Sequence, residues 1–305
     1  MAILDVPTFA VVAGPWHLAS VTPAPFNFLT WSRDGARLAI RNGAADVTII
    51  DIPSGRSTVV PSPALPLGIG NVDFSADGTR LAIADNFAGV RLVDLRTNAT
   101  IAQHYEHAWW FVNFVTFSPD GSRLAVGPFG GVETVLDGST LAPVAACQAA
   151  PGSAAWSHDG TEFAVKEETG DLVVLDPATC ARRETLSGSH AAGGVAFSPD
   201  GKRLASRGPD GTRIWDVATG AEIGTALPDT GDLLPTTYGF AADGRLMSTA
   251  VSATSSTVLF DLDPDHWLTT ACAMVGRNLT QDEWTRYIGT LDAYRNTCPL
   301  YPAGP

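Results

Sequence analysis

One short phrase recurs along the chain at nearly constant intervals. It reads "FSPDGSRLAV" at residues 117–126 and returns as "WSRDGARLAI", "FSADGTRLAI", "WSHDGTEFAV", "FSPDGKRLAS" and the diverged "FAADGRLMST". The Asp-Gly pairs begin at Asp34, Asp77, Asp120, Asp159, Asp200 and Asp243, in steps of 43, 43, 39, 41 and 43 residues. An aromatic residue stands three positions before each pair, at Trp31, Phe74, Phe117, Trp156, Phe197 and Phe240. A spacing this regular requires one structural unit to be repeated along the chain.

A second phrase follows the first in every unit, and it is an apolar segment that ends in aspartate. These aspartates are Asp51, Asp94, Asp137, Asp176, Asp216 and Asp261. Each unit therefore reads as strand, Asp-Gly turn, strand, short loop, strand, turn and a weaker fourth strand. Four strands in about 40–45 residues are typical of a propeller blade. The sequence predicts an all-β propeller of six to seven four-stranded blades.

The segment at residues 188–220, "GSHAAGGVAFSPDGKRLASRGPDGTRIWDVATG", resembles a WD40 repeat. Trp215 and Asp216 form the WD dipeptide, and His190 stands where the family has its Gly-His histidine. The resemblance implies a hydrogen-bonded tetrad within this blade, formed by His190, Ser206, Asp210 and Trp215. The other repeats have lost the tryptophan and carry Ile50, Val93, Leu136, Leu175 and Phe260 in its place. Those blades must depend on apolar packing. The resemblance covers roughly residues 1–262, with repeats from about residue 28.

The N-terminal segment aligns with the middle of a repeat, since Asp5 in "MAILDVPTFAVVAG" matches Asp51. Residues 1–13 therefore read as a half blade with a third and a fourth strand. The sequence leaves two numbers of blades open. Residues 8–13 complete the last blade of a six-bladed ring, which removes exposed sheet edges, or residues 2–13 belong to a seventh blade.

Residues 263–305 change character and predict a helical tail packed on the last blade. Pro264 opens a helix with Trp267, Leu268, Ala271, Cys272 and Val275 at helical spacing and Gly276 at its end. Thr280 and Glu283 form a capping box at the start of a second helix, whose apolar stripe is Trp284, Tyr287, Ile288 and Leu291.

The tail motif "ACAMVGRNLTQDEWTRYIG…YRNTCP" resembles the C-terminal end of WD40 propellers in bacterial, especially actinobacterial, proteins. In those proteins the propeller often follows a signalling NTPase of the STAND class. The resemblance implies a covalently linked signalling domain upstream, in a longer parent protein. This chain has no G-x-x-x-x-G-K-[ST] phosphate-binding loop, so it gains no nucleotide chemistry from the resemblance.

Charge excludes two classes of partner. The chain has 32 acidic and 19 basic residues, a net charge of −13, which disfavours nucleic acid and anionic membrane surfaces. The N-terminus carries Asp5 and Pro7 and no basic segment, so it is not interpreted as a signal peptide. The compartment stays open between the cytoplasm and the extracytoplasmic face of a bacterial membrane protein.

Four cysteines, Cys147, Cys180, Cys272 and Cys298, have spacings of 33, 92 and 26 residues and no C-x-x-C, which disfavours a zinc site. Free buried thiols and two disulfides are both compatible with this number. A Cys272–Cys298 bond would fasten the helical tail. Cys147 and Cys180 lie on or near outer strands of adjacent blades and are a second possible pair.

Candidate catalytic groups are few. The Asp-Gly and third-strand aspartates recur in every unit, which favours a role in turns over catalysis. In "HYEH", His104 and His107 flank Glu106 without an evident third metal ligand. His17, His158 and His266 have no partner that the sequence identifies. There is no G-x-S-x-G motif. We therefore expect no enzyme activity, no metal and no cofactor.

The aromatic residues that do not repeat predict a partner-binding face. "EHAWWFVN" at residues 106–113 carries Trp109, Trp110 and Phe111 in a loop between blades. Loops expected at the same end of the propeller carry Trp16, Phe87 and Phe129, together with Leu233, Leu234 and Pro235. Exposed aromatic clusters are typical of interfaces, whereas the alternative is packing of Trp109, Trp110 and Phe111 between blades. The sequence predicts a sensor or scaffold that binds a protein or peptide. The alternative function is an enzyme or small-ligand site in the axial channel.

Overall fold

The computed structural model describes most of the chain. The described residues are 3–4, 11–14, 29–42, 46–61, 69–85, 89–105, 112–128, 133–147, 154–167, 169–189, 194–208, 210–227, 235–241, 243–250, 256–287, 295–298 and 300–302. They form two compact units, Met1–Pro228 and Asp229–Pro305. The change of character that the sequence has at residue 263 lies within the second unit, which contains both strands and helices.

The first unit consists of a short hairpin and five sheets in series. The hairpin pairs β1 (Ile3–Leu4) with β2 (Val11–Ala13). Sheet 1 comprises β3 (Leu29–Trp31), β4 (Arg37–Asn42), β5 (Asp46–Asp51) and β6 (Ser57–Val60). Sheet 2 comprises β7 (Ile69–Phe74), β8 (Arg80–Asp85), β9 (Gly89–Asp94) and β10 (Ala99–His104). Sheet 3 comprises β11 (Val112–Phe117), β12 (Arg123–Pro128), β13 (Glu133–Asp137) and β14 (Pro143–Cys147).

Sheet 4 comprises β15 (Ala154–Trp156), β16 (Phe163–Lys166), β17 (Leu172–Leu175) and β18 (Arg182–Leu186). Sheet 5 comprises β19 (Val195–Phe197), β20 (Arg203–Gly208) and β21 (Gly211–Asp216). The segment after β21 takes the place of a fourth strand in sheet 5, because it pairs with β21 through the antiparallel bridges Thr212↔Leu227 and Trp215↔Glu222. All five sheets are meanders in which chain neighbours pair antiparallel. The predicted series of four-stranded antiparallel units is therefore confirmed.

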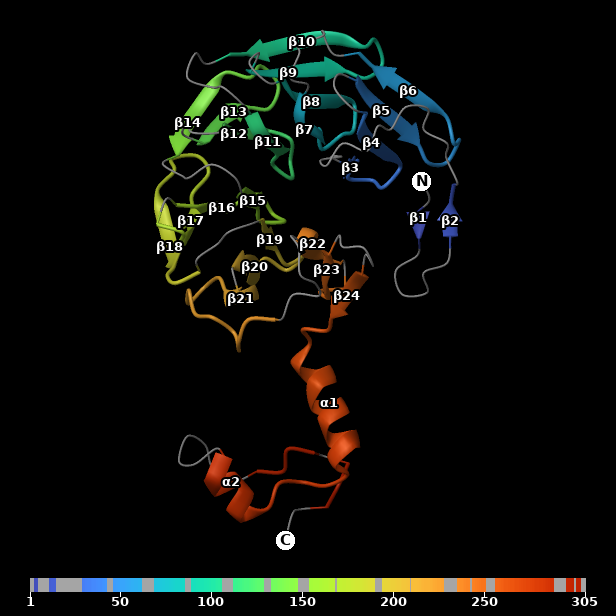
Figure 1. Ribbon diagram of the computed structural model, residues 1–305. Helices are drawn as coiled ribbons and strands as arrows, with labels where there is room; N and C mark the ends of the chain where they lie inside the picture. The colour runs from blue at the N-terminus through green and yellow to red at the C-terminus, as the bar shows by residue number, and fades with distance from the viewer. Residues whose placement is uncertain are drawn as a thin grey trace. The chain divides into compact units, whose positions relative to one another are not determined.

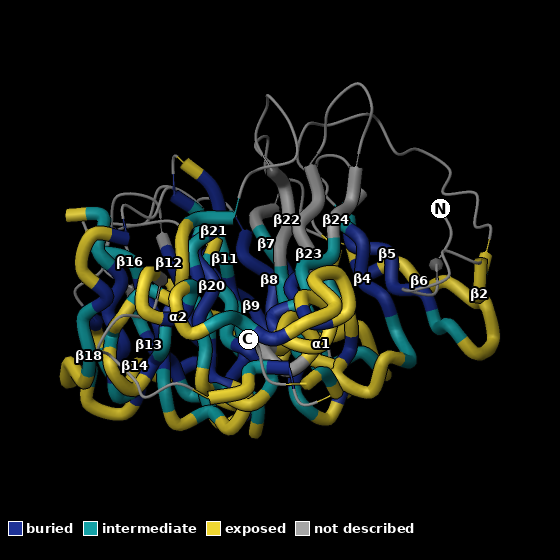
Figure 2. The backbone as a smooth tube through the Cα atoms, turned by 90° about the horizontal axis from the view of Figure 1, so that it is seen from below, coloured by how far each residue is buried: buried dark blue, intermediate teal, exposed yellow. Residues whose placement is uncertain are grey.

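Within this unit, the first strand of each sheet lies innermost and the last strand outermost (Figure 1). The middle strands are buried, whereas turns and fourth strands are teal or yellow in Figure 2. In sheets 2 to 5, the repeated aromatic residue at the end of the first strand packs on the preceding sheet. Phe74 joins a cluster with Ala39 and Val47 of sheet 1. Trp156 packs with sheet 3 in the same way and donates its indole N–H to the Thr116 carbonyl at 3.1 Å.

The Asp-Gly turns are closed by their own side chains. The Ser118 hydroxyl donates to Asp120 Oδ1 at 2.6 Å, and the Ser122 N–H donates to the same oxygen at 3.0 Å. Gly121 has a φ of 72°, which an L side chain rarely adopts. The same serine–aspartate bond, at 2.6–2.7 Å, closes the turns of Asp34, Asp77, Asp159 and Asp200. These carboxylates are turn residues, as their periodicity predicts.

The arginine three residues after the turn aspartate connects one sheet to the next. Arg37 Nη1 donates to the Gly78 carbonyl at 2.7 Å, from sheet 1 to sheet 2. Arg80 Nη1 reaches Gly138 at 3.1 Å, and Arg123 Nη1 reaches Pro177 at 2.7 Å. A charged donor makes a stronger hydrogen bond than a neutral one. These arginines therefore fix the relative position of consecutive sheets.

The second unit holds sheet 6 and two helices. Sheet 6 consists of β22 (Pro235–Phe240), β23 (Leu246–Ala250) and β24 (Ser256–Phe260), and the helices are α1 (Pro264–Val275) and α2 (Gln281–Tyr287). The predicted capping box is confirmed, since Thr280 N–H donates to Glu283 Oε2 at 2.9 Å and Glu283 N–H to Thr280 Oγ1 at 3.2 Å. Ile288 and Leu291 lie outside the described residues. Among those described, no helix is long and apolar enough to cross a membrane.

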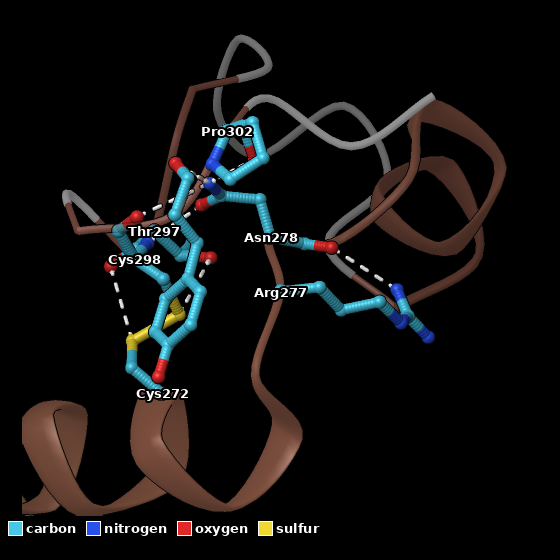
Figure 3. The surroundings of a disulfide bond; sticks show 7 residues. Cys272, Arg277, Asn278, Thr297, Cys298 and Pro302 are labelled. Carbon is cyan, nitrogen blue, oxygen red and sulfur yellow. Dashed lines mark hydrogen bonds between the residues drawn. A yellow bond between two sulfur atoms is a disulfide. The ribbon is translucent and has the colours of Figure 1, made fainter.

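Two disulfides stabilise the chain. Cys147 on β14 bonds to Cys180 in the turn after β17, which joins sheets 3 and 4. Cys272 on α1 bonds to Cys298. Beside this second bond, the buried Asn278 donates through Nδ2 to the carbonyls of Cys298, Tyr301 and Pro302 and accepts from the Cys298 N–H at 2.6 Å (Figure 3). The Cys272–Cys298 bond and Asn278 together hold the last described residues near α1.

We predict that Arg123→Met lowers the free energy of unfolding of the sheet unit by about 1–3 kcal/mol, because it removes a charge-assisted hydrogen bond between sheets and keeps most of the apolar stem. Urea unfolding followed by tryptophan fluorescence measures the effect. Arg96→Met is the control, since Arg96 is exposed in a turn, and it should change stability by less than about 0.5 kcal/mol. Equal stability of the two variants would contradict the role of Arg123.

Candidate functional site

The aromatic residues that predict a partner-binding face lie outside the described residues. They are Trp16, Phe87, Trp109, Trp110, Phe111 and Phe129, and Glu106, His107, Leu233 and Leu234 lie outside as well. The strand ends that carry their loops are described. These strand ends, the anchor points of the loops, are the part of the predicted face whose geometry the structure describes.

The anchor points of the loops at residues 86–88 and 106–111 touch each other. Gly89, which begins β9, has a φ of 80°, and a Cβ there would lie 2.1 Å from the His104 carbonyl oxygen and 3.0 Å from Tyr105 Cα. Only glycine permits this approach. Val112 of β11 pairs with Pro128 of β12. In the sequence, Phe111 directly precedes Val112 and Phe129 directly follows Pro128, so the segments that contain these two phenylalanines are attached at one cross-strand pair. The loops that carry Phe87, the tryptophan pair and Phe129 thus leave the same edge of sheets 2 and 3.

A buried ion pair supports this edge. Arg91 Nε lies 2.6 Å from Asp85 Oδ2, and the two side chains are 6% and 3% exposed. Arg91 Nη2 also donates to the Pro61 carbonyl at 3.3 Å, after the last strand of sheet 1. Removing one partner of a buried pair leaves an uncompensated charge, so loss of either residue is expected to destabilise this edge. The sequence pattern did not single out this pair, although Asp85 follows the apolar run of β8 and Arg91 interrupts the apolar run of β9.

Part of the tetrad implied by the WD40 resemblance is described. The Trp215 indole N–H donates to Ser206 Oγ at 2.8 Å, and both residues are buried. Asp210 forms an ion pair with Arg213 at 2.6 Å. His190 lies outside the described residues. The tryptophan–serine bond joins β20 to β21 within sheet 5.

A cavity of about 290 Å³ lies among the first strands of sheets 1 to 5. Its polar lining consists of Thr30, Asn71, Asp73 and Thr116, and its other lining residues are Leu29, Val72, Phe114, Val115, Ala154, Gly194 and Val195. The described lining therefore contains one carboxylate and no histidine. Most of it is apolar or small.

The carboxylate of Asp73 is bonded to three neighbouring first strands. Oδ1 accepts from Thr30 Oγ1 at 3.2 Å and from the Phe74 N–H at 3.0 Å, and Oδ2 accepts from the Phe117 N–H at 2.8 Å. The Thr116 side chain adds a further hydrogen bond. A carboxylate has about four lone-pair sites, so Asp73 retains little capacity for a metal or substrate.

The pKa of Asp73 is shifted in the opposite direction from the pKa of the turn aspartate Asp120. Burial raises the pKa of Asp73 to about 6, against the opposing hydrogen bonds from Phe117 and Thr30. The Ser118 hydroxyl and the Ser122 N–H instead hold the pKa of Asp120 below its usual value. Asp120 is therefore ionised at neutral pH and cannot act as a general acid.

The remaining candidates for chemistry do not converge. Within the described ranges, no group of three His, Cys, Asp or Glu side chains could hold a metal ion. His266 Nδ1 lies 2.9 Å from Asp261 Oδ2 at the surface. His158 is exposed beside the fourth Asp-Gly turn, and His17 lies outside the description. The third-strand aspartates cap turns, as Asp137 does by accepting from the N–H groups of Ser139 and Thr140 at 3.0 and 2.8 Å.

Comparison with models of protein families and with curated proteins finds no match to this chain. The resemblance to WD40 repeats therefore rests on the quoted phrases and on the series of four-stranded sheets.

We predict that Asp73→Asn changes how stability depends on pH. The pKa of Asp73 in the folded chain, about 6, exceeds the ordinary value of 3.8, so the stability that its neutral form contributes is complete at low pH and is lost as pH rises through about 6. The wild type should lose stability relative to Asp73→Asn over this interval, as measured by urea unfolding at each pH.

Asp120→Asn provides the matched control of opposite sign. The lowered pKa of Asp120 means that its carboxylate contributes stability above pH 3.8, which is lost on acidification. The wild type should therefore gain stability relative to Asp120→Asn as pH rises from acid. Curves for wild type and Asp73→Asn that stay parallel across the interval would contradict the account of Asp73.

Proposed function

We propose that this chain is a non-catalytic, WD40-like β-propeller that binds a protein or peptide with the loops at one edge of its sheets. In this proposal it acts as a sensor or scaffold within a larger bacterial signalling protein. The observation that carries the proposal is that the periodic carboxylates are occupied by their own turns. The repeat therefore supplies a rigid support, and function is left to segments that do not repeat.

A closed ring is supported by the packing of the repeated aromatic residues. Phe74 and Phe117 are 4% and 6% exposed because a preceding sheet covers each of them. Such packing of each sheet on the one before it is what the blades of a propeller require. We therefore propose six to seven blades in a closed arrangement.

The partner-binding edge is supported by its anchor points. Gly89 brings the base of the loop at residues 86–88 against His104 and Tyr105, and the buried Asp85–Arg91 pair holds this base in place. Tyr105 itself is 48% exposed and precedes the segment with Trp109 and Trp110. Aromatic side chains on a rigid support lose little entropy on binding, and they are enriched in interface hot spots.

The alternative, an enzyme or small-ligand site in the axial channel, receives less support. A catalytic site in the channel would be favoured by titratable groups that converge from several sheets. The described part of the axial cavity contributes Asp73, whose oxygens already accept hydrogen bonds from β3, β7 and β11. We therefore favour the binding function.

The proposal is tested with the purified chain as bait and with the double variant Trp109→Ala/Trp110→Ala. Capture of its specific partner should fall at least tenfold, since loss of a central aromatic anchor costs about 2 kcal/mol or more. Quantitative mass spectrometry of the captured proteins measures the effect. Ile101→Ala is the control, because Ile101 is 50% exposed on the outer strand of sheet 2. Equal capture by wild type and the double variant would rule out this edge as the binding surface.

A further inference from the structure

Helix α1 presents an apolar stripe to solvent. Trp267, Leu268, Ala271, Met274 and Val275 follow one another at positions i, i+1, i+4, i+7 and i+8, which places them on one face of a helix. Trp267 and Leu268 are 48% and 43% exposed, and Met274 and Val275 are 78% and 55% exposed. Exposed apolar surface of this kind usually marks an interaction site.

This stripe is held in a fixed orientation. Cys272, next to Ala271 on α1, is bonded to Cys298, and the buried Asn278 fixes the backbone around Cys298 (Figure 3). The Trp267 indole N–H donates to the Asp261 carbonyl, which restricts the ring. The stripe is therefore a preorganised surface, and ordering it on binding costs little entropy.

The stripe is self-complementary about Ala271. Large side chains stand four and three positions before Ala271, at Trp267 and Leu268, and three and four positions after it, at Met274 and Val275. In an antiparallel pair of such helices, Ala271 meets Ala271 and Leu268 meets Met274. A small residue at the crossing point lets the helix axes approach closely, and the large residues then pack on both sides.

Charge and area also fit a second copy of the chain. Residues 266–275 contain no Asp, Glu, Lys or Arg, so pairing brings no like charges together although the net charge is −13. A specific interface built on these side chains is expected at the lower end of the usual range, about 1,200 Å² in total.

We propose that α1 is a dimerisation element that packs antiparallel on α1 of a second copy, symmetrically about Ala271. Together with the proposed function, this pairing gives each assembly two copies of the partner-binding edge of sheets 2 and 3, which raises the avidity for a partner with repeated binding segments.

Sedimentation velocity of the full chain across the micromolar range tests the proposal. The wild type should dimerise with rising concentration, and Met274→Asp should weaken association at least about tenfold, because it buries an unpaired charge. Ala273→Asp is the matched control, since it puts the same charge in the same helical turn on the opposite face, and it should leave association within about twofold. Circular dichroism verifies that each variant is folded. A wild type that stays monomeric, or equal effects of the two variants, would overturn the proposal.

A charge-pair experiment tests the antiparallel register. Leu268→Asp and Met274→Arg should each abolish self-association, because each buries an unpaired charge twice in its own dimer. Mixed together, they should form a heterodimer, because Asp at position 268 of one copy then faces Arg at position 274 of the other. Failure of the mixture to associate would overturn the register about Ala271.

Discussion

The described sheet unit depends on hydrogen bonds that cross from one sheet to the next. Apolar packing drives the sheets together, but it is non-directional and does not by itself fix their relative positions. On one side of the unit, the arginines after the Asp-Gly turns fix the positions of consecutive sheets through directional hydrogen bonds, as Arg37 does with Gly78 and Arg123 with Pro177. Near the inner strands, Asp73 joins sheets 1, 2 and 3. The Cys147–Cys180 bond adds a covalent connection between sheets 3 and 4.

These connections limit the chemistry that the fold can perform. A carboxylate that closes a turn, as Asp120 does, is ionised and engaged by its own turn. Its copies Asp34, Asp77, Asp159 and Asp200 accept the same serine hydrogen bond. Asp73 has the raised pKa that often accompanies catalysis, but its oxygens serve the backbone and hydroxyl groups of three strands. Function is therefore expected in the segments that interrupt the repeat: the loops that start near Gly89 and Val112, and the exposed stripe of α1.

The sequence predicted the features that depend on local chain properties. The strand series, the Asp-Gly turns and the capping box of Thr280 and Glu283 each need only a few neighbouring residues, so their signals survive in a single sequence. The inner-strand role of Asp73 and the Asp85–Arg91 ion pair were missed. Asp73 acquires its role because Thr30 and Phe117, each more than 40 residues away along the chain, are brought beside it. The sequence raised both disulfide pairs but could not choose between bonded and free thiols, which depends on how the chain brings Cys147 to Cys180 and Cys272 to Cys298.

The central claim is that polar bonds between sheets make the inner strands one cooperative structure. Native-state hydrogen exchange of the Phe117 amide tests it directly, because this N–H group leaves its own sheet to bind Asp73 of the preceding one. The account predicts that this amide exchanges only when the whole sheet unit unfolds, at the same free energy as the central amides of β12. Exchange of Phe117 at a much lower free energy than those amides would show that the sheets separate independently, and it would contradict the account.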